Sequence, residues 1–279
     1  MKSRNLIYLS SLFCIFSVYI SAVEEKLNAV QAQSMLAVLY AQSSAEYNAN
    51  NLQTYAGAKL ALDVALTKKN WTAAIEQKGN FVDKPAAVIL DIDETVLNNI
   101  PFQARAIIKG EGYPSGWIDW MLEEASTPVA GVKDFLDYAE RKGVKVFYVT
   151  NRVAIAEEAT RNNLKKLGLP LDTDRDVLLM KNENGWTSDK VSRRRLISED
   201  YRILLLIGDQ LGDFIPLEEA TVNMDSRHTI STKYKDMWGK KWFMITNPMY
   251  GRWEASIYNN EYPENENELI QMRMKALKP

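Results

Sequence analysis

The sequence predicts an α/β fold with a mostly parallel central sheet, because short apolar runs alternate with amphipathic segments after Pro85. The apolar runs have the length of buried strands and cover residues 86–90, 144–149, 177–180 and 203–207, with 242–245 as a candidate further strand. The segments between them have helical spacing and cover residues 131–142, 155–167 and 190–198. Gly143, Gly168 and Gly208 mark boundaries between these elements.

The N-terminal part of the chain has a different pattern. Residues 24–45 and 51–69 are rich in Ala, Leu and Gln with helical apolar spacing, and Asn50 and Asn51 indicate a break between two helices. We therefore expect residues 23–84 to form a helical segment that packs on an α/β core. That core is expected to span residues 85–279, with a small cap insertion around residues 100–128.

The first residues have the features of an export signal. Lys2 and Arg4 precede a largely apolar stretch at residues 6–22, and a polar segment begins at Glu24. We expect a signal peptide over residues 1–22, and hence an exported protein: periplasmic, outer-membrane associated or secreted, in a bacterium. The alternative is an uncleaved anchor, because the apolar stretch is about the minimum length for a spanning helix.

The chain has one cysteine and one histidine, and these low counts exclude several kinds of site. Cys14 is the only cysteine and lies inside the signal, so the mature chain has no thiol nucleophile and no cysteine zinc site. Lipidation of Cys14 is the disfavoured alternative, because Phe13 precedes it and apolar residues follow; membrane association requires either this or an uncleaved signal. His228 is the only histidine, which excludes multi-histidine metal sites.

Composition limits the class of partner. Of the 279 residues, 46% are hydrophobic and 25% are charged, as in ordinary globular proteins. The formal net charge of -2 argues against a nucleic-acid polymer as partner. A homo-oligomer is compatible with the sequence.

Polar residues follow the predicted strands in a specific order. The carboxyl ends of parallel strands share one edge of a sheet, where ligands bind. Each set of polar residues that follows a strand has an ordinary explanation when taken alone: a solvated loop, a helix N-cap, a surface lysine or a turn. Together they predict one crevice that holds Asp91, Asp93, Thr150, Asn151, Arg152, Lys190, Asp209 and Asp213.

These residue types fit phosphoryl transfer. Four carboxylates, Asp91, Asp93, Asp209 and Asp213, are the oxygen ligands that Mg²⁺ prefers. Asp91 is a candidate nucleophile that forms an aspartyl-phosphate, and Asp93 a candidate general acid and base. Thr150 and Lys190 could then neutralise charge on the transferring group. We expect Thr95 to fix the turn and Glu94 to point away from the chemistry.

The motifs resemble those of the haloacid dehalogenase superfamily. Asp91, Asp93 and Thr95 match its Asp-x-Asp-x-Thr motif, Thr150 its second motif, and Asp209 with Asp213 its last. Its third motif is a lysine, matched by Lys190, with Lys181 as the rival. Four segments, "DIDETVLNN", "VFYVTNR", "GDQLGDF" and "NPMYGRWE", together with the helical "QSSAEYNANNLQTYAGAKLALD", are similar to class C acid phosphatases, the lipoprotein-e type 5'-nucleotidases. One departure is Asn98, where many members have Asp.

The resemblance implies roles for residues around the carboxylates. Thr150, Asn151 and Lys190 would bind phosphate, and Arg152 would do so too unless it forms a structural salt bridge. An aromatic clamp for the leaving group would be made by Trp117, Trp120 and Tyr250, with core packing as the equal alternative; Trp253 is expected in the core. Trp117 and Trp120, three residues apart in a short helix, share one face.

The sequence thus predicts an exported, Mg²⁺-dependent acid phosphatase that hydrolyses small phosphomonoesters, including nucleoside 5'-monophosphates, through an aspartyl-phosphate. The alternatives are a phosphotransferase that passes the phosphoryl group to an alcohol, and a non-catalytic storage or binding protein on the same fold.

Overall fold

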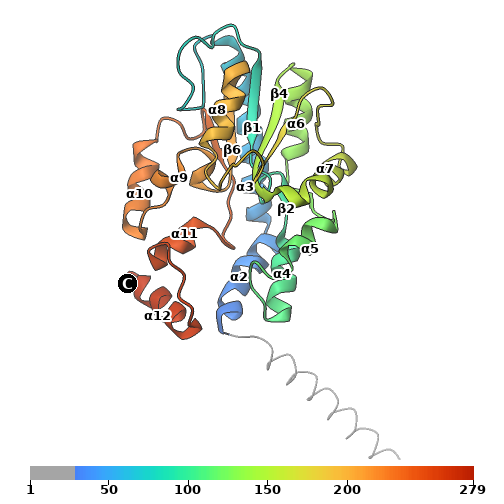
Figure 1. Cartoon of the computed structure of the whole chain (residues 1–279). Helices are drawn as coiled ribbons and strands as arrows, with labels where there is room; N and C mark the ends of the chain where they lie inside the picture. The colour runs from blue at the N-terminus through green and yellow to red at the C-terminus, as the bar shows by residue number, and fades with distance from the viewer. Residues whose placement is uncertain (1–28) are drawn as a thin grey trace, which may run out of the picture.

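The computed structural model describes residues 29–279, with the N-terminal helices, the sheet and the C-terminal helices in one body (Figure 1). The predicted signal peptide and Cys14 lie outside the described residues. Within residues 29–279, no helix is both long enough and apolar enough to cross a membrane.

A parallel sheet forms the centre of the fold. Its strands occur in the order β5-β4-β1-β6-β7, and every neighbouring pair is parallel. The predicted α/β class is therefore confirmed, and the candidate strand near the C-terminus is present at one edge. The strands are β1 (Ala86–Leu90), β4 (Lys145–Val153), β5 (Leu178–Lys181), β6 (Arg202–Gly208) and β7 (Trp242–Met244).

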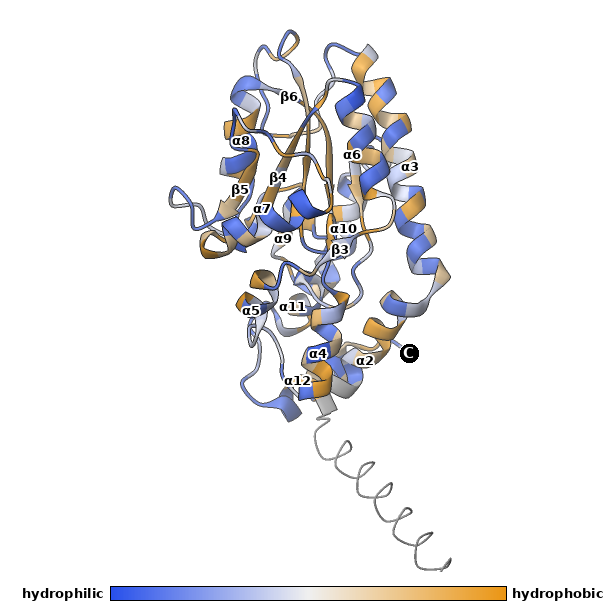
Figure 2. Cartoon of the chain, turned by 90° about the vertical axis from the view of Figure 1, so that its right-hand side faces the viewer, coloured by the Kyte–Doolittle hydropathy of each residue, from blue (hydrophilic) through white to orange (hydrophobic). Residues whose placement is uncertain are grey.

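Helices cover both faces of the sheet, because alternate residues of each strand point to opposite sides. On β1, Val88 and Leu90 pack in one core cluster, and Ala87 and Ile89 pack in the other. Figure 2 shows the hydrophobic strands between α3 and α6 on one side and α8 on the other. The helices on these faces are α3 (Ala45–Thr67), α6 (Val132–Arg141), α7 (Glu157–Lys166), α8 (Val191–Asp200), α9 (Leu217–Ala220) and α10 (Met224–Lys233), with the 3₁₀ turns η1 (Ala154–Ala156) and η2 (Leu211–Asp213).

The predicted break between the two N-terminal helices was wrong in position. α2 (Ala29–Ser43) ends before Ser44, and α3 continues without interruption through Asn50 and Asn51. The side chain of Ser44 accepts a hydrogen bond from the backbone N–H of Tyr47 (3.0 Å), which caps α3. Asn51 is 1% exposed, so tertiary packing holds it inside a helix despite its weak helical propensity.

A second layer of helices lies beyond the carboxyl ends of the strands (Figure 1). α2 contacts both α4 and α12 there. A small apolar cluster joins this layer, including Val38 of α2, Ile107 of α4 and Met249 of a late loop. The remaining elements are the antiparallel pair β2 (Leu97–Asn98) and β3 (Thr127–Pro128), and α4 (Ile100–Lys109), α5 (Trp117–Leu122), α11 (Arg252–Ala255), η3 (Ser256–Tyr258) and α12 (Glu266–Ala276).

Candidate active site

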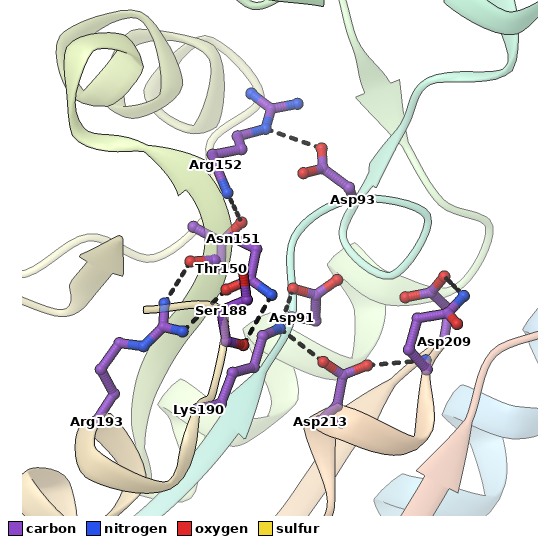
Figure 3. Close-up of polar contacts among 12 residues, drawn as sticks. Asp91, Asp93, Thr150, Asn151, Arg152, Ser188, Lys190, Arg193, Asp209 and Asp213 are labelled. Atoms are coloured by element: carbon purple, nitrogen blue, oxygen red, sulfur yellow. Dashed lines mark hydrogen bonds and ion pairs between the residues drawn. The ribbon is translucent and has the colours of Figure 1, made fainter. Parts of the chain in front are cut away.

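The turn after β1 separates the two candidate catalytic carboxylates. The backbone N–H of Asp91 still donates to the carbonyl of Ile207 on β6 (3.0 Å), so Asp91 is held in register with the sheet. The chain then reverses sharply, and the N–H groups of Val96 and Leu97 both donate to the carbonyl of Ile92 (2.8 Å each). Asp91 therefore faces β6, whereas Asp93 faces the end of β4 (Figure 3).

Asp91 belongs to a buried cluster of three carboxylates and one ammonium group. Lys190 Nζ donates to Asp91 Oδ1 and, at 2.6 Å, to Asp213 Oδ1. Asp91, Asp209 and Asp213 each offer a carboxylate oxygen, and these oxygens lie within 4.8 Å of one another. The structure thus places Lys190 in the site, whereas Lys181, the rival candidate, ends β5, where it pairs with Val153 of β4.

The electrostatics of this cluster favour a bound cation. Burial raises the pKa of Asp91 well above its usual range; the charge of Lys190 opposes this shift, and the neighbouring carboxylates add to it. Burial and the charge of Asp213 raise the pKa of Asp209 to about 7. Burial opposes the charged form of Lys190, but the two carboxylates that it contacts outweigh burial and raise its pKa. When all three carboxyls are ionised, they leave two negative charges against the one ammonium group, and the all-oxygen donor set fits Mg²⁺.

Asp93, predicted as a fourth metal ligand, is not part of this cluster. Its Oδ1 accepts from Arg152 Nε (2.8 Å) and from Asn99 Nδ2 (2.9 Å), and its side chain is 19% exposed. The metal-type cluster among the described residues comprises Asp91, Asp209 and Asp213. The turn explains the difference, because it carries the Asp93 side chain away from β6.

Arg152 supports Asp93 from the interior. Arg152 is 1% exposed, and its other nitrogens donate to Thr160 Oγ1 (3.2 Å) and Asn99 Oδ1 (3.3 Å). All three guanidinium nitrogens thus have protein partners. The geometry therefore favours the salt-bridge interpretation of Arg152 over direct phosphate binding.

Asn99 is the central residue of this network, and sequence reasoning did not assign it a role. It is fully buried, and its Oδ1 accepts from Trp120 Nε1 (2.8 Å) and Ser126 Oγ (3.0 Å). Its backbone N–H donates to Glu94 Oε1 (2.8 Å). Glu94 lies in the left-handed region (φ 60°) with no exposed surface, and burial raises its pKa well above the usual range. The signal that could have indicated Asn99 was its position five residues after Glu94 within "DETVLNN".

Thr150 and Asn151 belong to β4, which continues to Val153, beyond the predicted end at Val149. Thr150 is buried, and its Oγ1 accepts from the backbone N–H of Arg152 (3.0 Å). Asn151 is exposed, and its Nδ2 donates to the carbonyl of Ser188 (3.1 Å). The two residues thus lie between Asp93 and the loop that carries Lys190 (Figure 3).

A buried arginine in α8 joins β4 to this loop, and the sequence did not single it out among three consecutive arginines. Arg193 has no exposed surface, and it donates to Asn151 Oδ1 (2.9 Å), to the carbonyl of Thr187 (3.0 Å) and to the carbonyl of Thr150. Burial lowers its pKa to about 10. Arg193 therefore fixes Thr150, Asn151 and the Lys190 loop relative to one another.

Gly208, the last residue of β6, leaves room for the side chain of Asp213 to pack against the backbone. A Cβ on Gly208 would lie 2.2 Å from Asp213 Oδ2, so only glycine fits there. Asp209 Oδ2 accepts from Gln210 Nε2 and Asn247 Nδ2, both at 2.8 Å. Gln210 and Asn247 were not predicted, although both lie within the segments "GDQLGDF" and "NPMYGRWE".

The predicted aromatic residues occupy different environments. Trp120 is 2% exposed and donates to Asn99, so it is a core residue and its ring offers no face to a ligand. Trp117 is half-buried, and the Arg152 guanidinium lies 5.8 Å from its ring centre. Tyr250 is half-buried against the apolar cluster of the helical layer. Trp253, expected in the core, is instead 38% exposed, because α11 is short and lies at the surface.

The sheet and the carboxylate cluster at its edge define an α/β protein of the haloacid dehalogenase type. The model of the HAD superfamily, subfamily IIIB (acid phosphatase), matches residues 17–253. The chain belongs to this family, and the resemblance seen in its motifs is confirmed.

Solved and curated relatives agree with this assignment. A class C acid phosphatase from Bacillus anthracis superposes with a TM-score of 0.78 at 33% identity, covering 89% of this chain and 98% of that chain. Acid phosphatase 1 of Solanum lycopersicum is 30% identical over 132 residues, 46% of this chain and 51% of the relative. Vegetative storage protein 1 of Arabidopsis thaliana is 28% identical over 135 residues, 46% of this chain and 48% of the relative. The chain spans about half the length of the curated relatives that it matches.

Proposed function

We propose that this chain is an exported, Mg²⁺-dependent acid phosphatase that acts on small phosphomonoesters through an aspartyl-phosphate on Asp91. One observation carries the proposal: two carboxylates that follow the same strand have different partners. Asp91 lies in the buried cluster with Lys190. Asp93 is 19% exposed and is aimed by Arg152 and Asn99.

In the first half-reaction, a carboxylate oxygen of Asp91 attacks the phosphorus of the ester. The bond from phosphorus to the leaving oxygen breaks, and protonated Asp93 gives its proton to that oxygen as the alcohol leaves. Free water reacts with a phosphate ester only slowly. The carboxylate of Asp91 is fixed in the site, so its oxygen is already positioned for attack, which lowers the barrier.

In the second half-reaction, Asp93 takes a proton from water as the water oxygen attacks the aspartyl-phosphate. The bond from phosphorus to the Asp91 oxygen breaks, which releases phosphate and restores Asp91. Lys190, which donates to Asp91, and the Thr150 hydroxyl balance the charge on the transferring group. Asp91, Asp209 and Asp213 would hold Mg²⁺, which would supply further neutralisation of the phosphoryl oxygens.

The substrate class and the location of the enzyme are the finer parts of the proposal. Half-buried Trp117, in contact with Arg152, and Tyr250 provide apolar rings for a nucleoside or aryl leaving group. The basic and apolar leader supports export. The intact mass of the protein recovered from the producing cell tests cleavage: loss of residues 1–22 is expected, and retention of the full leader would contradict it.

Hydrolysis of an aryl phosphate tests the activity. Purified protein should release phosphate with Mg²⁺ and lose this activity with chelator. Asp91→Asn should abolish turnover with an unchanged circular dichroism spectrum, because the amide cannot act as the nucleophile. Asp236→Asn is the matched control: Asp236 is exposed, and Lys240 at 3.5 Å is its ion-pair partner among residues 29–279, so activity should persist.

Each other outcome identifies an alternative. Full activity in Asp91→Asn contradicts the nucleophile assignment. An inactive wild-type protein in Mg²⁺ supports a storage protein, as the name of one relative suggests for that relative. Phosphorylated nucleoside formed in place of free phosphate, when nucleosides are added, identifies a phosphotransferase.

A further inference from the structure

A second buried arginine of α8, Arg194, reaches the loop that carries Asp213. Arg194 is fully buried, and its Nη1 donates to the backbone carbonyls of Gly212 (3.2 Å) and Asp213 (3.0 Å). It follows Lys190 by four positions, so the two side chains leave neighbouring points on one face of the helix. Lys190 pairs with the carboxylate of Asp213, whereas Arg194 holds its backbone. Both parts of this candidate metal ligand are therefore held from the same end of α8.

The other side of the Arg194 guanidinium is held by Glu76. Arg194 Nε donates to Glu76 Oε1 (2.8 Å), and Nη2 donates to the same oxygen. The two side chains are only 1% and 3% exposed. Glu76 lies 118 positions earlier in the chain, in the segment between α3 and β1. This buried ion pair therefore joins the loop after β6 to a distant part of the sequence.

The segment around Glu76 is itself fixed to the sheet. The backbone N–H of Ala73 donates to the carbonyl of Ile203 on β6 (2.8 Å). The backbone N–H of Ile203 donates in turn to Gln77 Oε1 (3.1 Å). Glu76 is therefore a rigid partner, and β6 sets the position of the Arg194 guanidinium through it.

This ion pair is better suited to fixing a position than to stabilising the fold. Glu76 Oε2 is buried and has no hydrogen-bond partner among the described residues. A buried ion pair is often no more stabilising than apolar side chains of similar volume, and an unpaired carboxylate oxygen makes it less so. The guanidinium is planar, however, and its donors point in fixed directions. Arg194 can therefore hold the carbonyls of Gly212 and Asp213 in one orientation relative to Glu76.

We propose that Arg194, held by Glu76, positions Asp213 for binding of a divalent cation, which rests on the Mg²⁺ site of the proposed function. The fixed backbone keeps an oxygen of the Asp213 carboxylate within 4.8 Å of those of Asp91 and Asp209. A ligand that is free to move must be ordered when the cation binds, and this ordering lowers affinity. Arg194 is thus a positioning residue, and the property that it controls is the affinity for the cation.

Calorimetric titration of Mg²⁺ into the metal-free protein tests the proposal without any substrate. Arg194→Met should raise the Mg²⁺ dissociation constant roughly tenfold or more, because the support of one ligand is lost. Arg202→Met is the matched control, since Arg202 is a buried arginine at the start of β6 that donates to the carbonyls of Lys68 (2.6 Å) and Lys69 (3.2 Å). It should lower the midpoint of thermal unfolding in chelator and leave the Mg²⁺ dissociation constant unchanged.

Glu76→Gln is the second variant, for use where Arg194→Met does not fold. Its amide oxygen can still accept from the guanidinium, but the charge of Arg194 is no longer balanced and opposes a cation nearby. The Mg²⁺ dissociation constant should therefore rise several-fold. Wild-type Mg²⁺ affinity in a folded Arg194→Met, or in Glu76→Gln where Arg194→Met does not fold, would overturn the proposal. An equal loss of affinity in Arg202→Met would overturn it too.

Kinetics separate this proposal from the proposed function. With an aryl phosphate, Arg194→Met should need more Mg²⁺ for half of its maximal rate, and kcat at saturating Mg²⁺ should stay close to that of the wild type. A lower kcat with an unchanged Mg²⁺ requirement would overturn the role in cation binding. A wild-type protein that binds Mg²⁺ without hydrolysing the ester would contradict the phosphatase activity and leave the role of Arg194 standing. A wild-type protein that does not bind Mg²⁺ would overturn both.

Discussion

Two carboxylates that differ by two positions acquire different chemistry from their neighbours. Asp91 meets Lys190, which is 99 positions later, and Asp93 meets Arg152, which is 59 positions later. Both basic partners are almost fully buried, so each is positioned by packing. We therefore propose that, at the scale of single residues, the identity of the partner decides which carboxylate attacks phosphorus and which one transfers the proton.

Replacing Arg152 tests its support of Asp93. Arg152→Gln should lower kcat for an aryl phosphate by roughly 10–100-fold, because Asp93 loses the group that aims it for proton transfer. The variant should also lose about 1–3 kcal/mol of unfolding free energy, since buried partners remain unpaired.

The control for Arg152 is an exposed arginine with a similar partner. Arg105 pairs with Glu123 at 2.7 Å, but their side chains are 51% and 43% exposed. Arg105→Gln should therefore leave kcat and stability nearly unchanged. Equal activity in Arg152→Gln and the wild type would show that Asp93 needs no such support.

At the scale of strands and helices, the structure depends on where each element begins, ends and docks. β4 runs past the predicted end to Val153, because Val153 pairs with Lys181 after an irregularity in the register. α3 runs through two asparagines because its cap is at Ser44. α12 is placed by Arg273, which donates to Tyr258 Oη (2.6 Å) and Gln33 Oε1 (2.7 Å) and pairs with Glu254.

The contacts of Arg273 predict how α12 is held. Arg273→Met should raise the rate of amide hydrogen exchange in residues 266–276, because about three hydrogen bonds to the rest of the helical layer are lost. Lys275→Met, an exposed substitution in the same helix, should leave the exchange rate unchanged. Unchanged exchange in Arg273→Met would show that apolar contacts alone dock α12.

In the whole molecule, the helical layer closes over the carboxyl edge of the sheet, where three carboxylates and Lys190 are buried together. Like charges inside a protein repel strongly, since the interior screens them less than water does. Together the three carboxylates form an unfavourable charge arrangement that a bound divalent cation would relieve.

The charge of the cluster predicts a thermal shift with Mg²⁺. Mg²⁺ at about 100 times its dissociation constant should add about 2.7 kcal/mol to the unfolding free energy, or about 5–10 °C in the unfolding midpoint. Asp209→Asn should abolish this shift and raise the midpoint in chelator, because it removes one of the repelling charges. Asp236→Asn should retain the full shift. A midpoint that does not respond to Mg²⁺ in the wild type would contradict the cation site.

The sequence by itself determined the α/β class, the order of the strands along the chain and the strand ends that carry the chemistry. These follow from local periodicity and from the rule that parallel strands end at one edge. It also singled out Asp91, Lys190, Asp209 and Asp213, because their residue types and order are specific. Only the tertiary structure decided that Asp93 and Arg152 form a separate pair, that Trp120 is a core residue, and that Asn99, Arg193 and Asn247 hold the site. Those contacts join segments that are distant in the sequence. Their relative positions depend on side-chain packing, which cannot be predicted from local sequence.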